Sequence, residues 1–348
     1  MRRSWKWLAL AVPVSLVACS EQPSAPTPTP PSGSLTAARG FRISDLGTLG
    51  GANSEARAIN DEGWVVGWSE VSQAGVRHAF LWKGARMIDL GTLGGTSSQG
   101  LGVNNGGEVV GSSQIAGDAA WHAFRWSHGR MTDLGSLGGS YAEGFVINDR
   151  GDVAGSSVTA GGVLHAALWR HGTLTDLGTF GGTLSWSNGI SSSGMVVGGA
   201  TITGDAAQHP FLWRNGVMTD LGSLGGTSAG ASSINGNGVI VGGSTLTGDL
   251  ITHAFLWRHG QMSDLGDLGG GYSYAQWIND VGQVVGGSCL ADGSCHAFLW
   301  YNGRMADLGI LPGGNPWSWA QSINDRGQVA GLAYTAAWEE HAVLWTTR

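Results

Sequence analysis

The sequence has few charged residues and no excess of basic ones. Asp, Glu, Lys and Arg make up 12% of its 348 residues, about half of the usual share. The formal net charge is −7, and Lys and Arg are not gathered into a basic patch. Proteins that bind nucleic acids need such a patch to neutralise phosphates, so we expect no nucleic acid among the partners.

The apolar run near the N-terminus is short. It covers Leu8–Val17 and follows the basic residues Arg2, Arg3 and Lys6. A membrane-spanning helix needs about 20 apolar residues, so this run is too short to span a bilayer. A basic segment followed by a short apolar segment is typical of a signal peptide, and it predicts export of the chain.

The end of this run carries a short motif, Leu16-Val17-Ala18-Cys19. It resembles the lipobox of bacterial lipoproteins, in which the Cys is acylated and becomes the new N-terminus. The resemblance implies a signal peptide over residues 1–19, a lipid on Cys19 and membrane contact through that lipid alone. The alternative is an ordinary signal peptide cut near Ala18. Ser20 follows the Cys, and in Gram-negative lipoproteins a residue other than Asp there favours the outer membrane.

Residues 20–39 are rich in Pro, Ser and Thr. Such a segment buries too little apolar surface to fold, so we expect a linker between the lipid anchor and a domain. The predicted location is therefore outside the cytoplasm, at the outer membrane or the cell surface. We expect the domain to be a monomer.

Cysteine is scarce as well. Apart from Cys19 the chain has only Cys289 and Cys295, in the segment "SCLADGSC". In an oxidising compartment the simplest reading of this pair is a disulfide that closes a short loop. A metal or redox site is the alternative, but no cluster of His and Cys at ligand spacing surrounds the pair. We therefore predict no metal and no cofactor.

Glycine is abundant, with 61 residues, and much of it belongs to a repeated unit. The motif "DLG" recurs at intervals of 43 or 44 residues. Its Asp residues are Asp45, Asp89, Asp133, Asp176, Asp220, Asp264 and Asp307. A fixed period of this length indicates a repeat architecture.

One unit reads as four short strands, at 54–60, 64–69, 78–82 and 86–91. "NDxG" turns such as Asn148–Gly151 separate the first two strands, and Asn and Gly suit such turns. Pairs such as Asn215-Gly216 separate the last two strands and suit a two-residue hairpin, which requires positive φ. The third strand is the continuous apolar run "AFLW", as expected where both faces are buried.

Four antiparallel strands in every 40–50 residues are typical of a β-propeller blade. A β-solenoid is the rival architecture, but its coils are usually shorter and hairpin turns do not suit it. The predicted fold is thus all-β, a seven-bladed β-propeller over residues 40–348. The last unit ends after three strands, and 41–45 is a fourth strand with none before it. We expect 41–45 to complete the C-terminal blade and to close the ring, which would remove open sheet edges.

The units also share the motifs "HAF", "DLGTLGG" and "IN..G.VVG.S", and "HAF" begins at His78, His122, His253 and His296. With these motifs the chain resembles the bacterial extracellular HAF-repeat family over residues 40–348. Three units differ from the "HAF" motif and have "HAA", "HPF" and "HAV" instead, and all three keep the His. The family is largely uncharacterised, so the resemblance implies an extracellular location and a repeat architecture but no activity.

Residues that recur once per unit are more typical of a scaffold than of a site. They include one His and one Trp per unit as well as the Asp of "DLG". A ring of metal-binding or acid–base His residues is the alternative, but these side chains would be spread around the disc. We expect each His and Asp to bond buried backbone at the blade edge.

Function is expected where the units differ. The loops between the second and third strands and those between units vary most, and both sets would emerge on one face, here called the loop-rich face. One position at the start of the innermost strand also varies, and we expect it beside the channel mouth. The candidate ligand-binding residues there and nearby are Glu55, Gln99, Glu143, Trp186, Tyr274, Trp319, Trp317 and Tyr272.

These residues mix aromatic rings with carboxylates and amides. Aromatic faces stack on the C–H faces of sugars, and exposed Trp and Tyr also mark protein interfaces. The favoured function is therefore a binding module for a glycan or a surface protein. A purely structural or adhesive protein is one alternative. The alternative role for the aromatics, in place of ligand binding, is to fill gaps between uneven blades.

An enzyme is the other alternative, a glycan hydrolase or lyase in which Glu55 and Glu143 act as acid and base. The motif "GTSAG" at 226–230 matches a nucleophile elbow, but it lacks the strand–turn–helix setting. We assign no catalytic residue and expect a binding protein rather than an enzyme.

Overall fold

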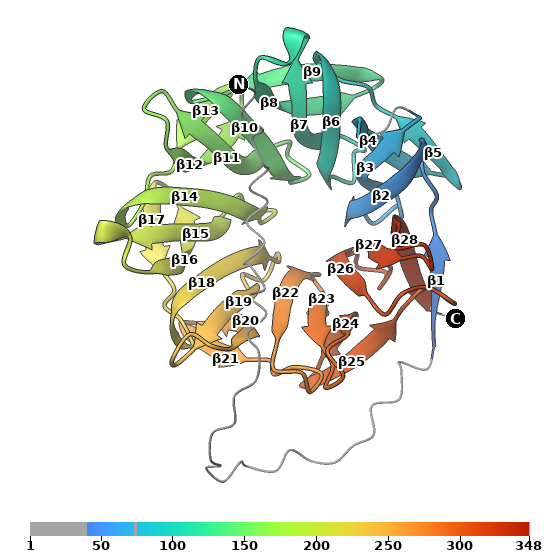
Figure 1. The fold of residues 1–348 in the computed structure, drawn as a ribbon. Coiled ribbons are helices and arrows are strands. Elements are labelled where there is room, and N and C mark those ends of the chain that lie inside the picture. The colour runs from blue at the N-terminus through green and yellow to red at the C-terminus, as the bar shows by residue number, and fades with distance from the viewer. Residues whose placement is uncertain (1–39, 73–74, 348) are drawn as a thin grey trace, which may run out of the picture. The chain divides into compact units, whose positions relative to one another are not determined.

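The computed structural model describes residues 40–72 and 75–347. The predicted signal peptide, the predicted acylation site Cys19 and the predicted linker lie outside the described residues. Within the described part, 28 strands and two short 3₁₀ helices are found. The strands are fanned around a common centre (Figure 1). No described helix is long and apolar enough to span a membrane.

The strands follow the repeat. The strands of residues 50–89 are β2 (Gly50–Ile59), β3 (Val65–Val71), β4 (Arg77–Lys83) and β5 (Arg86–Asp89). Those of residues 94–135 are β6 (Gly94–Val103), β7 (Val109–Ile115), β8 (Trp121–Ser127) and β9 (Arg130–Gly135), with the helix η1 (Ala116–Asp118). Those of residues 138–176 are β10 (Gly138–Ile147), β11 (Val153–Thr159), β12 (Leu164–Arg170) and β13 (Thr173–Asp176).

The same order continues. The next strands are β14 (Gly181–Ile190), β15 (Val196–Ile202), β16 (Gln208–Arg214) and β17 (Val217–Asp220), with η2 (Thr203–Asp205). They are followed by β18 (Gly225–Ile234), β19 (Ile240–Leu246), β20 (Thr252–Arg258) and β21 (Gln261–Asp264). The strands of residues 273–309 are β22 (Ser273–Ile278), β23 (Val284–Cys289), β24 (Cys295–Tyr301) and β25 (Arg304–Gly309). The last strands are β26 (Ser318–Ile323), β27 (Val329–Tyr334) and β28 (Glu340–Thr347).

The first strand joins the last sheet, as the sequence predicts. β1 (Phe41–Asp45) pairs with β28 in antiparallel register, and Phe41 lies opposite Thr347. The sheet order is β1-β28-β27-β26. Phe41 and Ile43 pack against a core cluster that includes the fully buried Trp345. The two ends of the described chain therefore lie side by side in one sheet.

Hydrogen bonding divides the 28 strands into five sheets, three of four strands and two of eight. Each eight-stranded sheet results from one parallel bridge between neighbouring units, Tyr141↔Trp121 in one and Gln208↔Ser228 in the other. The sheets are not joined into a closed ring by backbone pairing. The predicted number of seven blades therefore does not follow from the sheets alone.

The core lies between successive units. The third strand is buried on both faces, as its apolar run predicts, and Ala79, Phe80 and Leu81 have at most 4% exposure. Phe211 packs in one cluster with Val146 and Ile190, which come from two neighbouring units. A unit alone would leave these faces in water, so each unit depends on its neighbours for burial.

A chain of asparagine side chains also links successive units. Asn60 Nδ2 donates to Asn104 O at 3.0 Å, and Asn104 Nδ2 donates to Asn148 O at 3.2 Å. The same bond recurs further along the chain, and Asn324 Nδ2 donates to Asn60 O at 2.9 Å, which joins the last unit to the first. The chain is interrupted in one unit, where Ser191 stands in place of the Asn and accepts the bond from Asn148. We call this set the asparagine ladder.

The recurring His and Asp bond to each other, which corrects the expectation that each His bonds backbone. His78 Nδ1 lies 2.8 Å from Asp89 Oδ2, at the outer hairpin of its unit. The Asp also accepts a bond from the backbone of the Gly two residues later, as Asp89 does from Gly91 at 2.8 Å. His253 lies between two carboxylates, since its Nε2 is 3.2 Å from Asp267. These pairs fix the hairpin at its open end, away from its turn.

Candidate functional site

The variable position of the innermost strand lies within the strand, not at its start. Glu55 stands in the middle of β2 and is paired with Trp68 of β3. In five units the side chain at this position contacts the second strand of its own or the preceding unit. The residue contacted there is glycine in three consecutive units, which leaves room for a ring.

Three aromatic candidates fill that room. A Cβ atom built on Gly199, Gly243 or Gly287 would lie within 2.4 Å of the ring of Trp186, Tyr274 or Trp319, respectively. Tyr274 also receives a hydrogen bond from Ser232 of the preceding unit at 3.2 Å. These rings therefore contribute to packing between strands. Gln99, in the equivalent position, donates to Ser112 of its own unit at 3.0 Å.

Glu55 is held by three partners. Its carboxylate accepts bonds from Trp68 Nε1 and Gln321 Nε2, both at 2.8 Å, and Arg57 Nε lies 3.0 Å away. Gln321 belongs to β26, so the contact crosses from the last unit to the first. With 5% exposure and both oxygens bonded, Glu55 is better suited to holding this junction than to moving a proton.

Glu143 is different because it has one protein partner. Tyr141 donates its hydroxyl to Glu143 Oε2 at 2.6 Å. Burial raises the pKa of Glu143 to about 7, although the bond from Tyr141 and the charge of Arg57 oppose the rise. Arg57 of β2, which is paired with Glu55, therefore also acts electrostatically on Glu143 of β10, although the two carboxyls belong to different units.

Glu340 is a further carboxyl near these residues. It accepts a bond from the Tyr334 hydroxyl at 3.2 Å, and its backbone N–H donates to Asn53 Oδ1 at 3.0 Å. Burial and repulsion from Glu55 raise the pKa of Glu340 to about 7, against the effects of Tyr334, Arg57 and Arg77. Glu340 lies in β28 and thus joins the same junction between the last and first units.

Tyr272, Trp317 and Trp319 stand at the loop-rich ends of β22 and β26. Tyr272 and Trp319 have ring centroids 6.3 Å apart, and Trp317 is 38% exposed. Trp317 also forms a parallel bridge with Cys295. The structure contains a disulfide between Cys289 and Cys295, which closes the loop beside this bridge. We call Tyr272, Trp317 and Trp319 the aromatic surface.

The loop before Glu340 continues this surface. Asn315, two residues before Trp317, donates through Nδ2 to Thr335 O at 2.7 Å, and Tyr334 N donates to Trp317 O at 3.2 Å. The loop carries Trp338, which is 60% exposed and has its ring centroid 6.1 Å from that of Tyr334. The candidate site is therefore a set of rings and carboxyls contributed by the last two units and the first.

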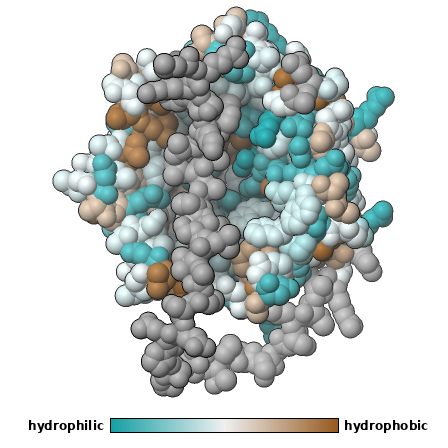
Figure 2. All heavy atoms as spheres, viewed as in Figure 1, coloured by the Kyte–Doolittle hydropathy of each residue, from teal (hydrophilic) through white to brown (hydrophobic). Residues whose placement is uncertain are grey.

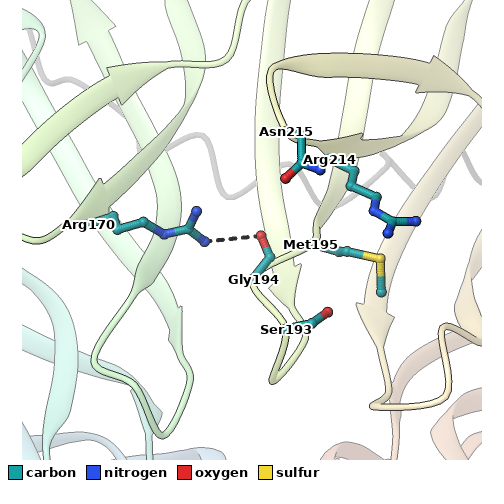
Figure 3. Close-up of a pocket in the computed structure, with 6 residues that line it drawn as sticks. All are labelled: Arg170, Ser193, Gly194, Met195, Arg214 and Asn215. Atoms are coloured by element: carbon teal, nitrogen blue, oxygen red, sulfur yellow. Dashed lines mark hydrogen bonds between the residues drawn. The ribbon is translucent and has the colours of Figure 1, made fainter.

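A pocket lies at the opposite ends of the strands, where the tight turns are. Its volume is about 260 Å³, and Arg170, Gly194, Met195 and Arg214 contribute to its lining. Figure 3 shows Arg170 reaching Gly194 O, at 3.2 Å, while the Arg214 side chain extends on the other side of the turn. Arg170 is also paired with the buried Asp152 at 3.1 Å. The two cations do not converge, so the pocket is not a convincing anion site.

No group of three or more metal-ligating side chains is found among residues 40–72 and 75–347. On the face seen in Figure 2, hydrophobic residues form small separate groups among hydrophilic ones. Large exposed apolar side chains occur in several units, singly as in Val217 or as the adjacent pair Leu250 and Ile251.

No family model matches the sequence, and no curated protein matches it either. Among solved structures, the chain is similar to the β-propeller domain of the Trilobed protease from Pyrococcus furiosus. The two share 12% identity over 89% of this chain and 97% of that one, with a TM-score of 0.58. This likeness shows a β-propeller fold and nothing about activity.

Two further similar structures have lower scores. A protein described as a TolB from Agrobacterium tumefaciens shares 16% identity over 69% of this chain and 87% of that one, with a TM-score of 0.47. A protein described as a gluconolactonase shares 13% identity over 90% of this chain and 98% of that one, also with a TM-score of 0.47.

Proposed function

We propose that this chain is a binding module, exported and held by a lipid on Cys19, that recognises a glycan through the aromatic surface. The observation that supports this proposal is the contact of the Tyr272 and Trp319 rings, 6.3 Å apart, two residues from the exposed Trp317, whose backbone bonds the loop that precedes Glu340. Pyranose rings stack on aromatic faces, and their hydroxyls bond to carboxylates and amides. A protein partner remains an outcome of the test.

The finer architecture belongs to the same proposal. We take each group of four strands as one blade, so that β1 with β26–β28 makes the seventh. The asparagine ladder supports this count, since it passes from unit to unit and returns from Asn324 to Asn60. In this arrangement the first and last blades meet at Glu55 and Gln321, beside the proposed site.

The location is inferred from the sequence. The motif around Cys19 and the linker to residue 39 support an outer-membrane or cell-surface anchor, and the repeat words support membership of the HAF-repeat family. The disulfide between Cys289 and Cys295 is in keeping with an oxidising compartment. We propose a monomer tethered by its lipid.

A glycan-active enzyme is the second candidate, and one observation favours it. Glu143 and Glu340 have pKa values raised to about 7, which is the range expected of a general acid at neutral pH. The contacts of Glu55 argue against an enzyme, because both of its carboxylate oxygens are already bonded by Trp68, Gln321 and Arg57. Glu143→Gln and Glu340→Gln test this candidate, because turnover that is lost in either variant while binding persists would establish it.

The binding proposal is tested with the full chain and a panel of cellohexaose, xylohexaose and chitohexaose, measured by calorimetry. We expect one member to bind and Trp317→Ala to weaken that binding about tenfold, equivalent to about 1.4 kcal/mol. Tyr301→Ala is the matched control, since Tyr301 is 40% exposed but lies at the tight-turn end of β24. Absence of binding to every sugar, or equal loss in both variants, would refute the proposal.

A further inference from the structure

Trp338 occupies a backbone conformation that bulky residues avoid. Its φ is +63°, in the left-handed region, and its side chain is 60% exposed. For an L-residue other than glycine this region costs about 1–2 kcal/mol, and a large side chain is uncommon there. A ring that is mostly in water recovers little of that cost through burial.

The equivalent loops of other units show what the turn itself requires. Gly162 and Gly293 stand three residues before their His, as Trp338 stands before His341, and their φ values are +84° and +85°. The turns share their hydrogen bonds, since Gly162 N bonds Thr159 O and Trp338 N bonds Thr335 O, at 2.9 and 3.1 Å. The turn thus takes glycine without strain, and the tryptophan is not there for the fold.

The loop holds this tryptophan in one place. Thr335 accepts through Oγ1 from Ala337 N and Glu339 N, and its backbone N–H bonds Glu339 O at 2.9 Å. Asn315 bonds Thr335 O from one side, and Asn53 accepts from Glu340 N on the other. A strained residue persists when its surroundings determine it in this way, and such residues cluster at ligand sites.

The side chain is also open to a ligand. Tyr334 packs near one part of the Trp338 ring, with centroids 6.1 Å apart at 56°. The indole N–H has no hydrogen-bond partner among the described residues. Glu339 adjoins Trp338 in sequence, and the half-buried Glu340 follows it. One aromatic ring with hydrogen-bonding groups at its rim fits a sugar ring, whereas a protein interface usually needs about 800 Å² per partner.

We propose that Trp338 is a sugar-stacking anchor, in which the indole face binds a pyranose ring and Glu339 and the indole N–H bond its hydroxyls. This inference rests on the proposed glycan-binding function and adds a subsite at the junction of the last and first units. Because the rigid loop fixes the indole before the ligand arrives, little conformational entropy is lost on binding.

The deciding variant is Trp338→Gly. It restores the residue that the turn prefers, so the melting temperature is expected to rise by about 1–3 °C while sugar affinity falls at least tenfold. A variant that merely unfolds the protein would lower both quantities. The matched control is Gly162→Trp, which should lower the melting temperature and leave sugar binding unchanged.

The measurement uses the full chain, calorimetry with the hexasaccharide panel, and thermal unfolding followed by circular dichroism. If the unmutated chain binds a sugar and Trp338→Gly binds it equally well, the inference is wrong but the proposed function stands. If Trp338→Gly lowers the melting temperature by several degrees, Trp338 is a packing residue and the inference is also wrong. If the unmutated chain binds no sugar, both proposals fail together.

Discussion

Asp45 and His341 are 296 residues apart in the chain, yet Asp45 Oδ2 lies 2.6 Å from His341 Nδ1. In the other units the same contact is made within a hairpin, between residues only 11 apart, as in His122 and Asp133. The N-terminal strand therefore supplies to the last sheet the same carboxylate that each complete unit supplies to itself.

The packing of β1 leads to a first prediction. Ile43 packs against the cluster that contains Trp345, so Ile43→Ala should lower the free energy of unfolding by about 2–4 kcal/mol. Ile88, on the equivalent strand β5, is 43% exposed and provides the control, with an expected effect within about 0.5 kcal/mol. Urea unfolding measures both. Equal effects would mean that β1 does not contribute to the core.

Removal of a ladder residue gives a second prediction. Asn324→Ala leaves Asn60 O and the backbone N–H of Gln328 without their side-chain partner at a buried position. An unsatisfied buried group costs about 1–3 kcal/mol, so the free energy of unfolding should fall by at least that amount. Asn237→Ala, at an exposed turn position, should change it by less than about 0.5 kcal/mol. If Asn324→Ala left the free energy of unfolding unchanged, the bonds of the asparagine ladder would add no stability.

Stability should also depend on pH through Glu340. Its pKa is raised to about 7 in the folded chain, so between the unfolded value and pH 7 the folded state binds more protons than the unfolded state. The free energy of unfolding then falls as pH rises through this window and levels off above it, by roughly 1–3 kcal/mol. In Glu340→Gln this fall should be smaller. An unchanged profile between pH 5 and pH 8 would contradict the assignment.

The bond between Tyr141 and Glu143 supports a fourth prediction. Tyr141 donates to the ionised carboxylate, which lowers the pKa of Glu143 against the larger effect of burial. Tyr141→Phe removes that donor, so the pKa of Glu143 should rise above about 7. Carbon-13 NMR titration of labelled glutamate follows the change. A lower pKa in the variant would show that Tyr141 does not stabilise the ionised form.

The sequence predicts the strands and their order because the period, the turn residues and the apolar third strand all agree. It also predicts that 41–45 pairs with the C-terminal strand, which is confirmed by the register of β1 with β28. The His–Asp contact could have been derived from the same pattern, since both residues stand at the open end of a short hairpin. The expectation of backbone bonds is wrong for the His because the Asp of the next strand lies within hydrogen-bond distance of its ring.

The direction of the variable side chains could not be derived in that way. Whether Tyr274 lies over Gly243 of the preceding unit depends on the twist and spacing of two sheets, and the repeat pattern carries no information about either. Trp338 was detectable, by contrast. When the loops are aligned on their His residues, Trp338 stands at the position of Gly162 and Gly293. A tryptophan at a position that is otherwise glycine indicates a candidate functional residue.

The pairing of β1 with β28 bears on how the gene for this protein could change in length. β1 and β28 flank the interior units, so recombination between interior repeats adds or removes whole units without altering either strand. The same pairing places Phe41 opposite Thr347, which makes the chain a good subject for circular permutation. If Thr347 were linked to Phe41 and new termini were placed at the turn between Lys83 and Arg86, β28 and β1 would form an ordinary outer hairpin. The permuted protein would keep the same sheets, with its strands in a different order along the chain.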